Sequence, residues 1–238
     1  MCLIAIAVHA SPRYPIVIAA NRDEFYERPT RPLHVWDDDP NIAGGRDLRA
    51  GGTWLAVTRD GRFAAVTNIR GNDGPPDARS RGALVGDFVR SNVAPLAYAE
   101  SIRADDYAGF HLLAGDRESV GHIATDTPAR LLGDGIFAVS NAAAAAIDWP
   151  KIVLAREAMS RALEGDDVVN ELLHFLTTPR GGPIEEEVFV ALPDRGYGTR
   201  SSTVIAMTND AIVMKEISHP SGDVIVVGNE FFLSGLAG

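Results

Sequence analysis

Short apolar runs rich in β-branched residues dominate the start of the chain and predict buried strands. Residues 2–9 and 16–21 are two such runs, separated by the segment 10–15, which contains Ser, Pro and Arg. Both runs are apolar at odd and at even positions, so both faces of each strand are expected to be covered. The pattern predicts two adjacent strands joined by a turn.

A hairpin is predicted farther along, where the runs 53–58 and 62–68 flank Asp60-Gly61. That pair is typical of a type I′ turn, which joins antiparallel strands through two residues. The preceding glycine-rich segment, 44–52, allows the backbone to come close to a neighbour or a ligand.

Helical patterns appear in two blocks. The first covers 80–91 and roughly 94–104, whose composition suits helices. The second opens with Asp148 as a predicted N-cap and Pro150 in the first turn, and a further helix begins near Asp166. The apolar positions of these last two helices recur at spacings of three and four: Ile152, Ala155, Met159 and Leu163, then Val169, Leu172, Leu173 and Leu176.

Strand-like runs return after each helical block, and hairpins are more evident than βαβ units. This order favours a layered α+β fold with antiparallel sheets. The segment 178–184 is predicted as a surface loop and not as a boundary, so residues 1–238 are expected to form one domain. The later predicted strands are 110–114, 120–124 and 136–140, then 203–208, 211–217 around Asn209-Asp210, and 224–227 leading into 231–233.

Composition narrows the classes of partner. The chain has 46% hydrophobic and 23% charged residues, ordinary values for a globular protein with a full core. Its net charge of −10 argues against nucleic acid and against anionic membrane surfaces. The apolar run 3–8 is too short to span a membrane, so no integral membrane association is expected. A single cysteine excludes a disulfide within the chain and fits a reducing, cytoplasmic location.

That cysteine is Cys2, directly after Met1. If Met1 is removed, one residue carries a thiol and an α-amine, both of which titrate close to neutral pH. The amine then serves as a general base for the thiol. The alternative is that Cys2 is a small buried hydrophobic residue, which is common for a lone cysteine. Position alone leaves both interpretations open.

Polar clusters follow several of the predicted strands. Asn21-Arg22-Asp23-Glu24 ends the second strand and lies beside Cys2 if the first two strands pair; a solvated turn is the alternative. Asn68 is a possible oxyanion donor at the end of its strand, and Asn141 ends another strand, although either amide also suits a simple turn. Arg200, in the segment 196–202, is a candidate for binding a carboxylate.

The six histidines have no metal-ligand spacing, and the chain has no HExxH or CxxC motif. No metal site is predicted. Haem remains possible as a ligand, although the sequence selects no axial histidine among His9, His34, His111, His122, His174 and His219. No phosphate-binding or dinucleotide-binding fingerprint is present.

Taken together, these motifs resemble the NRDE family, which includes the transport and Golgi organisation protein 2 homologues. The resemblance begins with Met1-Cys2 and the tetrapeptide 21–24 and extends to about Ile205. The other motifs that show the resemblance are Gly51-Gly52-Thr53-Trp54-Leu55-Ala56-Val57, Thr67-Asn68, Ser80-Arg81-Gly82, Asp87-Phe88, Gly109-Phe110, Ser140-Asn141 and Tyr197-Gly198-Thr199-Arg200-Ser201-Ser202-Thr203.

The family in turn resembles N-terminal nucleophile hydrolases of the penicillin V acylase and bile-salt hydrolase group. The resemblance implies a four-layer αββα sandwich with two mainly antiparallel sheets and cleavage of amide bonds by Cys2. Those acylases carry an arginine on the second strand where this chain has Ala20. The implied catalytic residues are Cys2, Asp23, Asn68, Asn141 and Arg200, and the implied substrate-binding residues are Asn21, Arg22, Trp54, Arg70 and Tyr197.

Two hypotheses therefore stand. The first is a hydrolase of a small amide or acyl substrate, which requires no cofactor. The second is a non-catalytic protein that binds or traffics haem or an acyl lipid on the same scaffold. A glutaminase domain, which also begins Met-Cys, fits less well because Leu3 stands where a glycine normally follows the cysteine. The oligomeric state is not fixed by the sequence.

Overall fold

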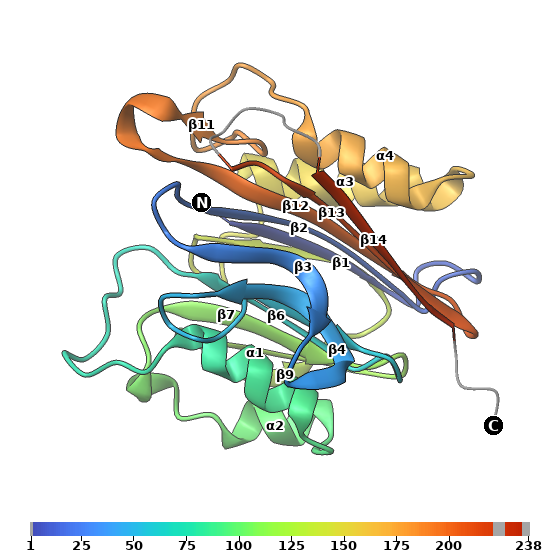
Figure 1. Ribbon diagram of the computed structural model, residues 1–238, viewed down its shortest axis with the longest axis horizontal. Coiled ribbons are helices and arrows are strands. Elements are labelled where there is room, and N and C mark those ends of the chain that lie inside the picture. The colour runs from blue at the N-terminus through green and yellow to red at the C-terminus, as the bar shows by residue number, and fades with distance from the viewer. Residues whose placement is uncertain (1, 221–226, 235–238) are drawn as a thin grey trace.

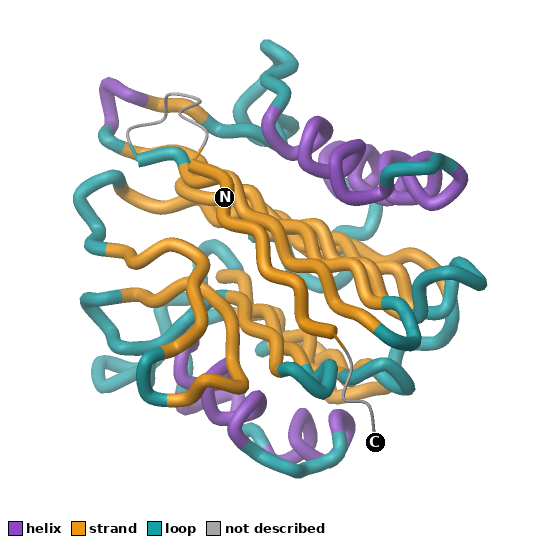
Figure 2. The backbone as a smooth tube through the Cα atoms, turned by 45° about the vertical axis from the view of Figure 1, so that its right-hand side comes forward, coloured by secondary structure: helices purple, strands orange, loops and turns teal. Residues whose placement is uncertain are grey.

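The computed structural model describes residues 2–220 and, as backbone alone, residues 227–234 (Figure 1). Two antiparallel sheets face each other, and a pair of helices covers the outer face of each one (Figures 1 and 2). The fold is therefore the predicted four-layer αββα sandwich. None of the helices in the described part of the chain is long and apolar enough to cross a bilayer.

The first sheet has the spatial order β10-β1-β2-β12-β13-β14, with β11 paired to β12, which makes seven strands within the described residues. All of its ladders are antiparallel. Its strands are β1 (Leu3–Val8), β2 (Ile16–Phe25), β10 (Gly135–Ser140), β11 (Ala191–Leu192), β12 (Tyr197–Met207), β13 (Ala211–Ser218) and β14 (Val227–Ser234).

The second sheet follows chain order, β3-β4-β5-β6-β7-β8-β9, and is also antiparallel throughout its seven described strands. These strands are β3 (Thr30–Trp36), β4 (Asp39–Asp47), β5 (Leu55–Thr58), β6 (Phe63–Asn68), β7 (Phe110–Gly115), β8 (Val120–Ala124) and β9 (Thr127–Leu131).

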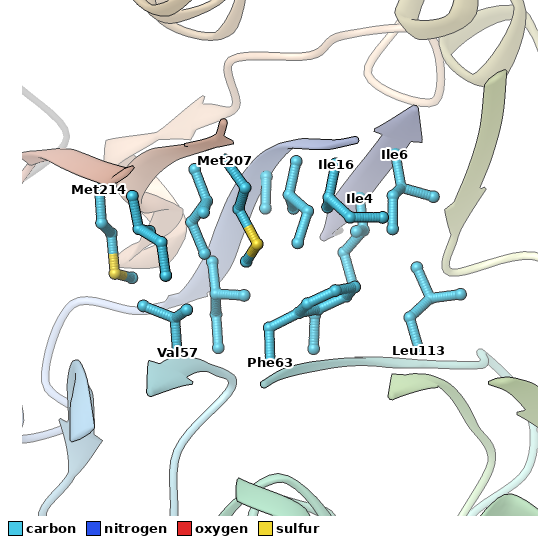
Figure 3. Close-up of a cluster of buried hydrophobic side chains, with 14 of the residues drawn as sticks. Ile4, Ile6, Ile16, Val57, Phe63, Leu113, Met207 and Met214 are labelled. Carbon is cyan, nitrogen blue, oxygen red and sulfur yellow. The ribbon is translucent and has the colours of Figure 1, made fainter. Parts of the chain in front are cut away.

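Strand alternation explains why the first run is apolar on both faces. Ile4 and Ile6 of β1 face the second sheet and pack against Phe63 and Leu113 (Figure 3). Leu3, Ala5 and Ala7 of the same strand pack instead against the helices on the outer face. The side chains of β1 therefore point alternately into the core between the two sheets and into the core beneath the helices.

The four helices of the described residues divide evenly between the two outer faces. Those that cover the second sheet are α1 (Arg81–Arg90) and α2 (Pro95–Ser101), and those that cover the first are α3 (Pro150–Glu164) and α4 (Val168–Thr177). The predicted apolar faces of α3 and α4 are confirmed, since Ala155, Met159 and Leu172 are buried against the sheet. Figure 2 shows both helical layers.

Several local predictions were wrong. The N-cap of α3 is Trp149 and not Asp148, with Pro150 in the first helical turn. The turn at Asp60-Gly61 is not type I′, because Gly61 has a φ of +95° while Asp60 has no positive φ. The second strand extends beyond its predicted end at Asn21, so the tetrapeptide 21–24 is the end of β2, which excludes the alternative of a solvated turn.

The strands β3, β4, β9 and the two-residue β11 were not predicted. The predicted loop 178–184 does lie between α4 and β11. The beginning of the last predicted strand, residues 224–226, lies outside the described residues. Glycine in the segment 44–52 does allow a close approach: a Cβ on Gly45 would lie 2.2 Å from the Trp54 ring.

Candidate active site

Strand pairing brings the N-terminus and two polar segments to one end of the sandwich. Leu3 pairs with Asn21 of β2 on one side and with Ser140 of β10 on the other. Because both neighbours run antiparallel to β1, the residues after Asn21 and after Ser140 flank Cys2. The N-terminus marks this end in Figure 1.

Groups on both neighbouring strands fix Cys2. Its Sγ lies 3.4 Å from the backbone N of Asp23, which donates to it, and 3.6 Å from the carbonyl oxygen of Asp23, to which the thiol donates. The carbonyl oxygen of Cys2 accepts a hydrogen bond of 2.7 Å from Ser140 Oγ. The half-buried thiol lines a cavity and is therefore held in place yet open to a ligand.

Asp23, whose backbone contacts the thiol, has a buried carboxylate that is oriented by β12. Its Oδ1 accepts a hydrogen bond of 2.8 Å from Thr199 Oγ1. The same Thr199 hydroxyl accepts from the backbone N of Val190 at 2.9 Å. Since the Val190 N–H occupies a lone pair of the hydroxyl, the hydroxyl proton is directed at Asp23.

Asn68, at the end of β6, and Asn141, directly after β10, are joined by a hydrogen bond that links the two sheets. Asn141 Nδ2 donates to the carbonyl oxygen of Asn68 at 2.8 Å, and the backbone N of Arg70 donates to the carbonyl oxygen of Asn141 at 3.0 Å. Asn141 therefore holds the end of β6 in place. The side chain of Asn68 remains exposed, and it lines both cavities of the cleft.

Two cavities adjoin at Asn68, Arg81 and Ala108. The smaller has a volume of about 350 Å³ and is lined by Cys2, Arg22, Asp23, Trp54, Asn68 and Arg81 among others. The larger, of about 610 Å³, is lined by residues that include Phe25, Asn68, Arg70, Asn141, Leu192 and Tyr197. Both volumes are typical of cavities that bind small molecules.

The smaller cavity contains ion pairs that orient its arginines. The guanidinium carbon of Arg22 lies 4.5 Å from the centroid of the Trp54 ring. Arg22 Nη2 is 3.8 Å from Glu24 Oε2 and 4.0 Å from Asp47 Oδ2, and Arg28 Nη2 is 2.7 Å from the same Asp47 oxygen. These contacts fix the Arg22 guanidinium at the cavity wall.

Tyr197 and Arg81 are both half-buried. Burial raises the pKa of the Tyr197 hydroxyl, so it stays protonated at neutral pH. Burial also lowers the pKa of Arg81, although the nearby Cys2 opposes that effect. Arg81 Nη1 donates to the carbonyl oxygen of Gly109 at 3.0 Å, which directs the guanidinium along the junction of the two cavities.

Two of the predicted residues point away from the cavities. Asn21 Nδ2 donates to the carbonyl oxygens of Leu176 and Val188, each at 2.9 Å, and so ties β2 to the helix layer. Arg200 Nη1 donates to the carbonyl oxygens of Phe25 and Tyr26 at 2.9 and 2.8 Å, and to that of Arg28 at 3.3 Å. Neither residue lines a cavity, so both support the scaffold of the site and do not contact its contents.

Three residues of the site had no predicted role: Ser140, Thr199 and Arg81. All three stand in motifs that the sequence displays, namely Ser140-Asn141, the segment 196–202 and Ser80-Arg81-Gly82. The motifs alone do not show which side chain of each faces Cys2, because that depends on strand register. Thr199, for example, faces Asp23 because these two residues pair directly between β12 and β2.

Among the described residues, no group of three or more His, Cys, Asp or Glu side chains is placed to hold a metal ion. None of the six histidines lines either cavity. A ligand in this cleft would meet a thiol, a phenol, amides, carboxylates and guanidinium groups.

Comparisons with known proteins place the chain among relatives of nearly the same length. The family model described as Transport and Golgi organisation 2 matches residues 1–216. The Transport and Golgi organization protein 2 homolog of Bos taurus is 31% identical over 254 residues, covering 90% of this chain and 91% of the relative. The Mus musculus homolog is 30% identical over 244 residues, covering 86% and 88%.

A solved structure shares the fold. It is that of the Caenorhabditis elegans N-acylethanolamine-hydrolyzing acid amidase ortholog, with a TM-score of 0.53 and 12% identity. The match covers 86% of this chain and 92% of the amidase chain. This likeness agrees with the sandwich described above and concerns the fold alone.

Proposed function

We propose that this chain, which belongs to the Transport and Golgi organisation 2 family, hydrolyses a small amide or acyl substrate with Cys2 as the nucleophile. The observation that carries the proposal is the placement of the Cys2 thiol. It is held 3.4 Å from the backbone N of Asp23 and faces a cavity that also contains the exposed Asn68. The amidase whose fold this chain shares acts on an amide, which supports the same class of reaction.

In the proposed reaction, removal of Met1 leaves the α-amine of Cys2 free. The amine takes the thiol proton, and Sγ attacks the substrate carbonyl carbon to form a tetrahedral intermediate. The side-chain amide of Asn68 donates to the developing oxyanion. The amine then returns its proton to the leaving nitrogen as the C–N bond breaks. Water adds to the resulting thioester, which releases the acid and restores the thiol.

The residues around Cys2 suit supporting roles in this sequence. Ser140 fixes the Cys2 carbonyl, and the Asp23 carboxylate, oriented by Thr199, accepts a hydrogen bond from the N-terminal amine. Asn141 keeps Asn68 in place. Rigid support of this kind lowers the reorganisation that the reaction requires.

The alternative is a protein that binds haem or an acyl lipid without turnover. The observation that favours it is the larger cavity, of about 610 Å³, whose lining includes Phe25, Ile69 and Leu192. Haem would find no histidine in either cavity, but Cys2 in one and Tyr197 in the other are side chains of the types that ligate haem iron. The relatives' names refer to transport, which is compatible with a binding role.

One experiment separates the two functions. The purified protein is first analysed by intact mass, and a retained Met1 contradicts the hydrolase. Wild type, Cys2→Ala and Cys2→Ser are then compared on a panel of N-acyl amides, with haem and a fatty acid titrated in parallel. Turnover that is lost in Cys2→Ala supports hydrolysis. Saturable binding by a protein that turns over no amide supports the binding function.

A further inference from the structure

Arg81 occupies the junction of the two cavities. Of the three described residues that line both, namely Asn68, Arg81 and Ala108, Arg81 is the charged one. Its Nη1 donates to the carbonyl oxygen of Gly109 at 3.0 Å, which fixes the guanidinium group there. A guanidinium group has several N–H donors, so this one hydrogen bond leaves others for a ligand in either cavity.

The other arginines that line the smaller cavity already have partners within the protein. Two of them form ion pairs with Glu24 and Asp47. Arg79 stacks on Tyr107, with its guanidinium carbon 5.2 Å from the ring centroid. Within the described part of the chain, no carboxylate forms an ion pair with Arg81. Arg81 is therefore the cation of this cavity that is able to take an anion from a ligand.

An ion pair would stabilise the Arg81 guanidinium where it lies. Arg81 is half-buried, and burial lowers its pKa, whereas Cys2 and Glu24 act to raise it. A charged group that loses hydration is unfavourable unless an opposite charge or hydrogen bonds replace the water. A carboxylate suits this place because a guanidinium group binds it through a pair of parallel hydrogen bonds.

The position of Arg81 relative to Cys2 limits where a substrate can carry that carboxylate. Cys2 and Arg81 line the same cavity, and Asn68, the proposed oxyanion donor, lines it too. A substrate whose carbonyl carbon is at Cys2 and whose carbonyl oxygen is at Asn68 therefore reaches Arg81 within a few bonds. The larger cavity begins at the same junction and has room for the rest of the molecule.

We propose that Arg81 binds a carboxylate that the substrate carries within a few bonds of the scissile amide. The site then favours N-acyl amino acids or monoamides of dicarboxylic acids over their neutral analogues. These two classes share the carboxylate and differ in the side of the amide on which it stands. The inference rests on the proposed function, because it names the substrate class of the same site.

The first test compares two alkylating agents that differ in charge and needs no substrate. Iodoacetate carries a carboxylate where iodoacetamide carries a neutral carboxamide, and each forms an Sγ–C bond with Cys2 and releases iodide. The ratio of their rates is independent of the thiolate fraction, because the thiolate is the nucleophile in both reactions. A change in the pKa of the thiol therefore cancels.

The variants are Arg81→Gln and Arg81→Lys, with Arg90→Gln as the matched control. Arg90 is the last residue of α1, forms an ion pair with Asp38, and lines neither cavity. Arg81→Gln is expected to lower the iodoacetate-to-iodoacetamide ratio on the order of tenfold. Arg81→Lys is expected to retain most of the wild-type ratio, and Arg90→Gln all of it. An unchanged ratio in Arg81→Gln, or an equal fall in Arg90→Gln, overturns the proposal.

The wild type alone gives a second readout, which holds even if Arg81→Gln does not fold. Acetylglycine and its neutral analogue acetylglycinamide are each added during alkylation by iodoacetamide. Acetylglycine is expected to slow the alkylation of Cys2 at a lower concentration than acetylglycinamide does. Equal protection by the two compounds, or none by either, overturns the proposal.

Paired substrates show which side of the amide carries the carboxylate. Hexanoylglycine is compared with hexanoylglycinamide, and glutaryl anilide with its terminal carboxamide. Wild type is expected to have a higher kcat/KM for the charged member of one pair, and Arg81→Gln is expected to lose that preference. Turnover without such a preference in either pair overturns the proposal. If no amide is turned over, the hydrolase function fails, and the alkylation ratio still decides whether Arg81 binds a carboxylate.

Discussion

Protonation of His122 is expected to make the fold sensitive to mild acid. His122 is buried against His111 between β7 and β8, with the two rings stacked at a centroid distance of 5.6 Å. His111 Nε2 lies 2.8 Å from the carbonyl oxygen of Ala142 and so donates to it, which leaves His111 Nδ1 to accept from His122 Nε2 at 3.4 Å. The remaining nitrogen of His122 must take up any added proton. Burial, followed by His111 and Arg130, lowers the pKa of His122 to about 4.

The magnitude follows from the difference between folded and unfolded states. Unfolded His122 has a pKa near 6.5, so below that pH the unfolded chain binds a proton that the folded chain does not bind until the pH is much lower. A group of this kind contributes stability above its unfolded pKa and loses it as the pH falls. When the pH falls from about 7.5 to 5, proton uptake by His122 in the unfolded chain should lower the free energy of unfolding by about 2 kcal/mol. Few carboxylates titrate in that window, because their usual pKa values are near 4.

Urea denaturation, followed by tryptophan fluorescence, measures this effect. The free energy of unfolding is determined for wild type and His122→Gln at both pH values, and the loss on acidification is compared. Wild type is expected to lose about 2 kcal/mol more than the variant. The exposed His174 supplies the control, since His174→Gln is expected to keep the wild-type loss. Equal losses for wild type and His122→Gln would refute the reasoning.

Three further predictions concern side chains around the site. Gly45→Ala should displace Trp54, whose ring lies 2.2 Å from the added Cβ, and should destabilise the protein by about 1–3 kcal/mol in urea denaturation; an unchanged midpoint would contradict the clash. Ser140→Ala removes the 2.7 Å hydrogen bond to the Cys2 carbonyl and should cost about 1 kcal/mol and reduce the alkylation rate of Cys2. If Ser140→Ala keeps the stability and the alkylation rate of the wild type, Ser140 does not anchor Cys2. Glu216, whose pKa is raised mainly by burial, binds more protons when folded than unfolded, so its carboxylate weakens the fold as the pH rises. Glu216→Gln should therefore lose less stability than wild type between about pH 5 and pH 8, and an equal or greater loss in the variant would show the sign to be wrong.

The buried strands and helices were predictable because their patterns are local. The apolar runs behind β1 and β2, and the spacing of three and four along α3, each signal an element without reference to the rest of the chain. β3 gives no such signal. It is an edge strand whose Arg31 and Pro32 are exposed, and an edge strand needs neither apolar faces nor a complete set of amide donors.

The tetrapeptide 21–24 shows why a polar sequence can still be a strand. By itself it reads as a turn, because four polar side chains in a row usually require water. In the structure their partners come from distant segments: Asn21 binds carbonyls near α4, Arg22 stacks on Trp54, and Asp23 accepts from Thr199. The local pattern contains none of these partners, so the segment could be assigned to a site only through the predicted pairing of the first two strands and the family resemblance.

The same alternation determines which site residues the sequence could reveal. Successive residues of β2 face different layers, so Arg22 reaches the cleft while Asn21 is directed into the helix layer. A motif read as one unit therefore misassigns Asn21 to substrate. Lys151 presents the opposite case, since it belongs to no strand-end motif and yet is fully buried in the first turn of α3. The sequence pattern does not reveal such a residue, because burial at a helix N-terminus is unfavourable for a lysine on two separate grounds and appears only in the fold.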